Sequence, residues 1–175
     1  MPYYWCKCHY LDASALVKLV ADDSEEELGR KALREYYWAH TASVYATSYS
    51  VAETLSAFKG KFLRKKISEV QYLKYVQDFL RTVIGANLRI DEVPILSVYS
   101  KAERLIKTYK IDFLDCLQIV TILEGYFRHS VSDSQSILIT ADRDLAKAAR
   151  AEGAKVWECT SEEAPRDVPP PEYRQ

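Results

Sequence analysis

Four acidic residues stand where they could hold a divalent cation. Asp12 and Asp142 follow apolar segments, Asp115 lies at the start of an expected helix, and Glu53 lies in another helix among apolar neighbours. Clustered carboxylates repel one another strongly in a low dielectric, and a bound divalent cation neutralises them. Hard oxygen ligands favour Mg²⁺ or Mn²⁺, which activate water and screen the charge of a phosphate. This set of side chains therefore predicts metal-dependent cleavage of a phosphodiester bond.

Three of the four acids also have structural interpretations, which the sequence leaves open. Asp115 suits the positive end of a helix dipole, and Asp142 suits the N-cap of the last expected helix. Glu53 could simply face solvent. Asp12 is the hardest of the four to explain as a purely structural residue.

Three further polar residues lie close to these acids in the sequence. Ser14 and Thr140 each stand two residues from an acid, where a hydroxyl could hold a carboxylate or a metal-bound water, or simply cap a helix. Asp112 precedes Asp115 by three residues and competes with it for a place in the site. Its expected N-cap position is a sufficient structural role, so the site is assigned to Asp115.

The expected elements alternate between strands and helices. Strands are expected at 3–11, 88–93, 136–140 and 154–159, with a short strand or extended link at 41–46. Helices are expected at 13–21, 24–37, 50–63, 69–84, 94–109, 113–126 and 144–153. Two of them open with capping boxes, Ser24 with Glu27 and Ser68 with Gln71. The alternation predicts a three-layer α/β/α fold with a central, mainly parallel sheet, and such sheets bind ligands at the carboxyl ends of their strands.

The size and composition of the chain indicate one globular domain. A chain of 175 residues suits a single domain at 1–160, followed by a proline-rich, flexible tail at 161–175. Apolar residues make up 48% and charged residues 28%, as is ordinary for globular proteins. The four cysteines lack the spacing of a structural zinc site. No apolar run could span a membrane and no basic start precedes an apolar signal stretch, so we expect the cytoplasm.

One basic cluster could contact nucleic acid. The formal net charge of −1 gives no global attraction to RNA, so any contact depends on local clusters. The candidate RNA-binding residues follow Glu53 and are interleaved with two phenylalanines, as in a phosphate track. They are Lys59, Lys61, Arg64 and Lys65, with Lys66 beside them. The alternative is a solvated helix face, which charge runs more often represent.

The ordered set of motifs resembles the PIN domain family, and VapC-type toxins in particular. The resemblance rests on the segments 11–16, 52–53, 115–119 and 138–142, and it spans residues 3 to about 158. Each motif alone is weak, whereas their order and spacing are fairly specific. By this resemblance the family's four acids fall on Asp12, Glu53, Asp115 and Asp142, and Asp144 becomes a candidate auxiliary ligand.

The resemblance implies a Mg²⁺- or Mn²⁺-dependent endoribonuclease that acts as the toxin of a type II toxin–antitoxin pair. It also implies a homodimer and a small antitoxin whose C-terminal segment docks over the site. Two features depart from the family, namely the longer segment at 127–136 and the proline-rich tail. Both bear on substrate entry and antitoxin docking rather than on the acids.

Other functional classes fit the sequence less well. A haloacid-dehalogenase-type phosphatase would need an aspartate two residues after Asp12, where the chain has Ser14. A receiver domain does not suit the helix-rich stretch at 47–84. The serious rival is a non-catalytic PIN-like module that binds RNA or protein, because the presence of four acids does not establish turnover.

Overall fold

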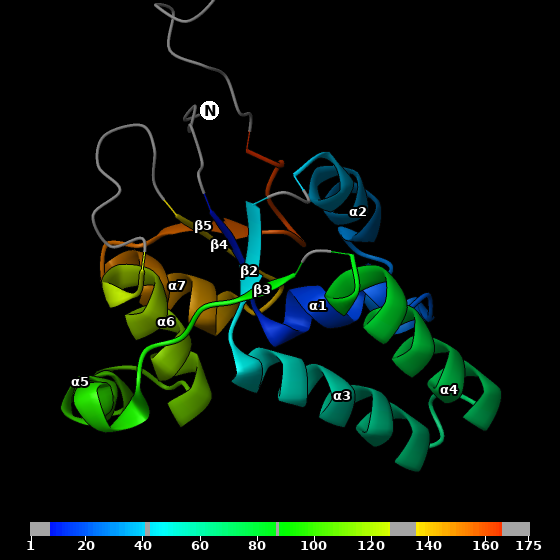
Figure 1. The fold of residues 1–175 in the computed structure, drawn as a ribbon, viewed down its shortest axis with the longest axis horizontal. Helices are drawn as coiled ribbons and strands as arrows, with labels where there is room; N and C mark the ends of the chain where they lie inside the picture. Colours follow the sequence, from blue (N-terminus) through cyan, green and yellow to red (C-terminus); the bar gives the residue numbers. More distant parts are fainter. Residues whose placement is uncertain (1–7, 41–42, 87, 127–135, 166–175) are drawn as a thin grey trace, which may run out of the picture.

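The computed structural model describes residues 8–40, 43–86, 88–126 and 136–165. Five parallel strands form one sheet in the order β3-β2-β1-β4-β5 (Figure 1). The strands are β1 (His9–Leu11), β2 (Val44–Ala46), β3 (Arg89–Ile90), β4 (Ile137–Thr140) and β5 (Lys155–Glu158). The start of the strand expected at 3–11 and most of the long segment at 127–136 lie outside the described residues.

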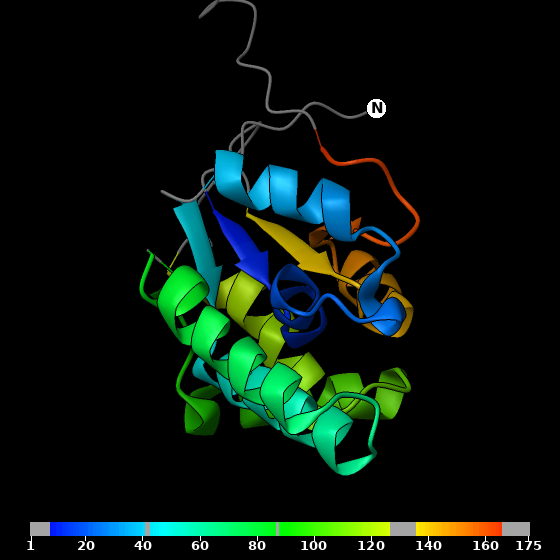
Figure 2. The ribbon, with the colours of Figure 1, turned by 90° about the vertical axis from the view of Figure 1, so that its right-hand side faces the viewer.

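Helices cover both faces of the sheet, as the two perpendicular views show (Figures 1 and 2). They are α1 (Ala13–Val20), α2 (Arg30–Ala39), α3 (Ser48–Leu63), α4 (Glu69–Asp78), α5 (Ile95–Thr108), α6 (Phe113–Glu124) and α7 (Arg143–Ala151). A short 3₁₀ helix, η1 (Ser24–Glu26), precedes α2, and a π-helical segment, η3 (Phe79–Ile84), continues α4. Among the described residues, no helix is both long and apolar enough to cross a membrane.

Each face of the sheet has its own hydrophobic core, because successive strand residues point to opposite sides. Leu11 and Ile139 pack with residues of α1 to α4 in one core. Tyr10 and Leu138 pack with residues of α5, α6 and α7 in the other. The predicted three-layer α/β/α arrangement is therefore confirmed, and all of the strand pairs are parallel.

One of the two predicted capping boxes is present and the other is wrong. Ser68 and Gln71 form both reciprocal hydrogen bonds at the start of α4. Ser24 does not cap a long helix, because α2 begins only after Gly29, which has a φ of 75°. A Cβ atom on Gly29 would lie 1.9 Å from the carbonyl oxygen of Cys159, so the chain turns where only glycine fits.

Candidate active site

The parallel sheet brings the loops after β1 and β4 to the same edge, where α/β proteins bind ligands. Asp12 directly follows β1 and caps α1, while Asp142 follows β4 and caps α7. Glu53 lies in the second turn of α3, which begins just after β2. Asp115 lies in the first turn of α6. All four predicted acids thus belong to segments that start at or near this edge.

Asp12 is buried and held by two hydroxyl side chains. Its Oδ2 atom accepts hydrogen bonds from the Ser14 amide at 3.1 Å, the Ser14 hydroxyl at 2.6 Å and the Thr140 hydroxyl at 3.1 Å. The same two hydroxyls accept bonds from the amides of Ala141 and Asp142. Burial raises the pKa of Asp12, against the lowering effect of these hydrogen bonds. The network joins the β1–α1 junction to the β4–α7 junction and fixes the carboxylate between them.

Glu53 and Asp115 lie in a different environment, in which burial and nearby like charges act in the same direction. Burial, followed by the charges of Asp12 and Asp112, raises the pKa of Glu53 from 4.5 to about 7. Burial, followed by the charges of Asp112, Asp12 and Asp142, raises the pKa of Asp115 from 3.8 to about 7. Asp12 therefore lies within electrostatic reach of both Glu53 and Asp115, and Asp142 lies within reach of Asp115.

Asp112 is an additional member of this group. Its Oδ1 atom accepts a hydrogen bond from the Asp115 amide at 2.9 Å, so its predicted N-cap role is confirmed. It also acts on the pKa of both Glu53 and Asp115, an effect that the sequence assignment left aside. The three-residue spacing of Asp112 and Asp115 was the available signal, because residues three apart on a helix are neighbours.

A buried hydrogen-bond network joins the helices that carry Glu53 and Asp115. Gln118 Oε1 accepts from the hydroxyls of Thr47 at 3.1 Å and Ser50 at 3.0 Å, and none of the three is more than 2% exposed. Ser50 lies one helical turn before Glu53, and Gln118 lies one turn after Asp115. The network therefore fixes the two acid-bearing turns relative to each other. The sequence analysis missed it, because its members are far apart along the chain.

The acidic cluster suits a hard divalent cation in its chemistry. This cluster consists of Asp12, Glu53, Asp112, Asp115 and Asp142. Within the described residues, none of its carboxylates forms an ion pair with a lysine or arginine. Oxygen ligands with uncompensated negative charge are what Mg²⁺ and Mn²⁺ prefer. As the side chains stand, however, no three histidine, cysteine, aspartate or glutamate residues of the described chain are placed to hold an ion. Holding a cation with three or more of these side chains would therefore require side-chain movement.

The structure contradicts the predicted RNA contact of Lys61. This side chain is 5% exposed, and its ammonium forms ion pairs of 3.0 Å with Asp23, Glu25 and Glu26. A contact with RNA would require this buried ammonium to give up all three partners, two of which, Asp23 and Glu26, are themselves partly buried. Lys59 is exposed and lies over the rings of two aromatic residues. Arg64 and Lys65 are exposed as well.

Asp144 occupies the first turn of α7 and is exposed. Its amide donates to Asp142 Oδ1 at 2.8 Å, which is part of the cap of this helix. The role of Asp144 as an auxiliary ligand stays a prediction.

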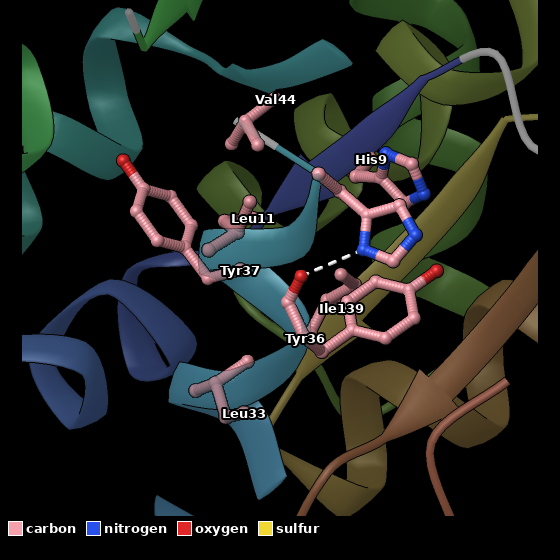
Figure 3. A pocket seen from close by; sticks show the side chains of 8 residues that line it. His9, Leu11, Leu33, Tyr36, Tyr37, Val44 and Ile139 are labelled. Carbon is pink, nitrogen blue, oxygen red and sulfur yellow. Dashed lines mark hydrogen bonds between the residues drawn. The ribbon is translucent and has the colours of Figure 1, made fainter. Parts of the chain in front are cut away.

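A hollow lies on the α2 side of the sheet, and its lining contains none of the four predicted acids (Figure 3). It is lined by aromatic and aliphatic residues that include His9, Tyr36 and Ile139, and it has no room for a water molecule. His40 Nδ1 donates to the Tyr36 carbonyl oxygen at 2.7 Å at its wall. This hollow therefore lies between α2 and one face of the sheet.

Comparisons with known proteins identify the family. The sequence pattern of the PIN domain matches residues 9–151, which is most of the chain. A solved structure with the same fold is the protein PAE2754 from Pyrobaculum aerophilum, with a TM-score of 0.56 and 18% sequence identity. The similarity covers 85% of this chain and 83% of that one. No curated protein sequence matches significantly.

Proposed function

This chain belongs to the PIN domain family, and from this premise we propose that it is a Mg²⁺- or Mn²⁺-dependent endoribonuclease. The family generally has a nuclease-type fold that uses divalent metal. The observation that carries the proposal is the group of mutually repelling carboxylates at the carboxyl edge of the sheet. A cation would relieve that repulsion, and RNA phosphodiester hydrolysis is a reaction that such a site suits.

The residues that would hold the cation are Asp12, Glu53, Asp115 and Asp142. When bound, it would supply an activated water and screen the negative charge of the scissile phosphate. Ser14 and Thr140 keep the Asp12 carboxylate in one orientation, so that ligand is preorganised. Gln118 keeps the turns that carry Glu53 and Asp115 in register.

One observation favours the alternative, a non-catalytic PIN-like module that binds RNA or protein. No three of the described acidic, histidine or cysteine side chains stand in a metal-binding arrangement. The two functions differ in what a chelator does, because only the nuclease loses its activity when metal is removed.

Cleavage of an end-labelled single-stranded RNA by purified protein tests the proposal. We expect cleavage in Mn²⁺ or Mg²⁺, none in excess EDTA, and none in metal with the Asp115→Asn variant. Asp78→Asn is the matched control, since Asp78 is an exposed acid of α4 paired with Lys74, and it should cut like the wild type. Cleavage that persists unchanged in EDTA, or that Asp115→Asn retains, would contradict the metal mechanism. Binding of RNA without cleavage in any metal would support the alternative.

We also propose that the protein is a cytoplasmic toxin of a type II pair, that it forms a homodimer, and that a small antitoxin inhibits it. The motif order that resembles VapC-type toxins supports this part of the proposal. Co-purification with the product of a small adjacent reading frame, and loss of RNA cleavage in that complex, are the expected results. Sedimentation of the isolated chain as a monomer would contradict the homodimer.

A further inference from the structure

A groove of about 300 Å³ runs along one side of α7. Basic residues of α7 form one wall, and the segment that follows β5 forms the other. Its lining residues are Arg143, Ala146, Lys147, Arg150, Glu158, Ser161 and Glu162. The basic positions are four and three residues apart, so they share one face of the helix.

Some charged side chains of the groove have ion-pair or hydrogen-bond partners and others do not. Arg150 is fixed, because it pairs with the Glu162 carboxylate at 2.6 Å and donates to the Val156 carbonyl oxygen at 3.1 Å. Glu158 is only 3% exposed, and the amide and hydroxyl of Thr160 donate to its carboxylate. Its negative charge is therefore turned inward and already hydrogen-bonded.

Arg143 and Lys147 are the groove cations that remain available. Both are exposed, and the side chain of neither forms a hydrogen bond or ion pair with another described residue. Arg143 acts on the Glu158 carboxylate only through its charge. Two unpaired cations, one helical turn apart, face an open groove.

Two lining residues of the groove, Arg143 and Glu158, are neighbours of residues at the acidic cluster. Arg143 directly follows Asp142, the acid that caps α7. Glu158 lies opposite Thr140 in the parallel pairing of β4 and β5, and Thr140 donates to Asp12. A chain that lies in the groove would therefore come close to the carboxylates of the cluster.

We propose that Arg143 and Lys147 bind phosphate groups of a single-stranded RNA and lead it to the acidic cluster. The inference rests on the proposed ribonuclease function and adds where the substrate lies. Arginine binds phosphate oxygens in a bidentate manner, and lysine binds them as a point charge. On α3, by contrast, Lys61 is closed off by three carboxylates.

This path is tested by measuring how RNA binding depends on salt concentration in a variant that does not cleave RNA. The parent is Asp12→Asn, and fluorescence anisotropy measures its affinity for a labelled single-stranded RNA between 50 and 200 mM salt. Adding Arg143→Glu and Lys147→Glu should weaken binding and lower the salt slope by about 1.4, since each lost phosphate contact removes about 0.7 for a single strand. Arg143→Gln with Lys147→Gln should lower the slope by the same amount.

The matched control is Lys31→Glu with Lys107→Glu, which changes the net charge equally at two exposed lysines of α2 and α5 that belong to no proposed site. It should leave the salt slope close to that of the parent. If the parent binds RNA and the α7 variants bind it with the same affinity and slope, the groove assignment is overturned and the proposed function stands. If the wild type neither binds nor cuts RNA in metal, the proposed function fails together with the groove.

Discussion

Within the acidic cluster, Asp12 lies in one environment and Glu53 and Asp115 lie in another. Asp12 is almost fully buried, yet three hydrogen-bond donors converge on one of its oxygens. Glu53 and Asp115 are less buried, and burial together with the charges of acidic neighbours raises the pKa of each to about 7. The fold by itself orients the Asp12 carboxylate. The carboxylates of Glu53 and Asp115 instead lie beside like charges that a bound cation would neutralise.

By this difference the proposed metal site would be partly preorganised. The hydroxyls of Ser14 and Thr140 fix one ligand before metal binds, so less order remains to be imposed on binding. Glu53 and Asp115 keep their negative charge uncompensated and their side-chain geometry open. This agrees with the lack of a ready group of three ligands among the described residues. Metal binding should therefore affect both stability and the positions of Glu53 and Asp115.

The largest expected effect comes from Asp12→Asn. RNA cleavage should fall at least about a hundredfold, the loss that one missing electrostatic contact commonly causes in an active site. In EDTA the variant should melt at or above the wild type, because an asparagine oxygen can still accept the three hydrogen bonds while one negative charge is removed from the cluster.

Metal should reverse that order of stability. At a hundredfold excess over its Kd, Mn²⁺ should stabilise the wild type by about 2.7 kcal/mol and stabilise Asp12→Asn much less. Thermal melting of both proteins, with Asp78→Asn as the control, measures the difference. An Asp12→Asn protein that is clearly less stable in EDTA and gains as much from Mn²⁺ would mark Asp12 as a structural acid.

Gln118→Leu tests whether the buried hydrogen bonds between α3 and α6 position Glu53 and Asp115. The change removes the acceptor of the buried Thr47 and Ser50 hydroxyls, so the free energy of unfolding should fall by about 1–3 kcal/mol. The affinity for Mn²⁺ should fall as well, because the turns of Glu53 and Asp115 lose their common support.

Thr121→Val is the matched control for Gln118→Leu on the same buried helix. The Thr121 hydroxyl has no hydrogen-bond partner among the described residues, so its loss should cost less stability and leave Mn²⁺ binding unchanged. Urea unfolding in EDTA and a Mn²⁺ titration give both quantities. Equal effects of the two substitutions on stability and on Mn²⁺ affinity would contradict a specific role for Gln118.

The pH dependence of stability without metal is the smallest expected effect, since solvent partly screens both side chains. The folded pKa values of Glu53 and Asp115, about 7, lie above their ordinary values of 4.5 and 3.8. The unfolded chain therefore loses these protons first as the pH rises. The contribution of both groups is fully present below about pH 4 and is lost as the pH rises through about 7.

The difference in stability between the wild type and the Glu53→Gln/Asp115→Asn variant isolates this contribution. In EDTA the variant should gain relative to the wild type between about pH 5 and pH 8, and Mn²⁺ should reduce that gain. Urea midpoints at several pH values provide the measurement. A stability difference that does not change with pH would show that the pKa values of the two carboxylates are not raised in the folded protein.

Local signals in the sequence were sufficient for much of the fold. Asp112 and the pair Ser68 and Gln71 cap their helices as predicted, because a cap depends on side-chain and backbone groups only a few residues apart. The alternation of strands and helices likewise predicted the parallel sheet. A parallel sheet then requires that segments after different strands meet at one edge, which is why Asp12 and Asp142 could be paired in advance.

Only the tertiary structure decided what depends on packing between distant segments. Gln118 and Thr47 are 71 residues apart, and no local preference relates them. Lys61 reads as a solvated cation in sequence, but it is buried where α3 meets the acidic turn around η1. Ser24 fails as a long-helix cap because the backbone near Gly29 passes against Cys159. Propensity acts over a few residues, whereas burial and charge pairing depend on which helices the fold places side by side.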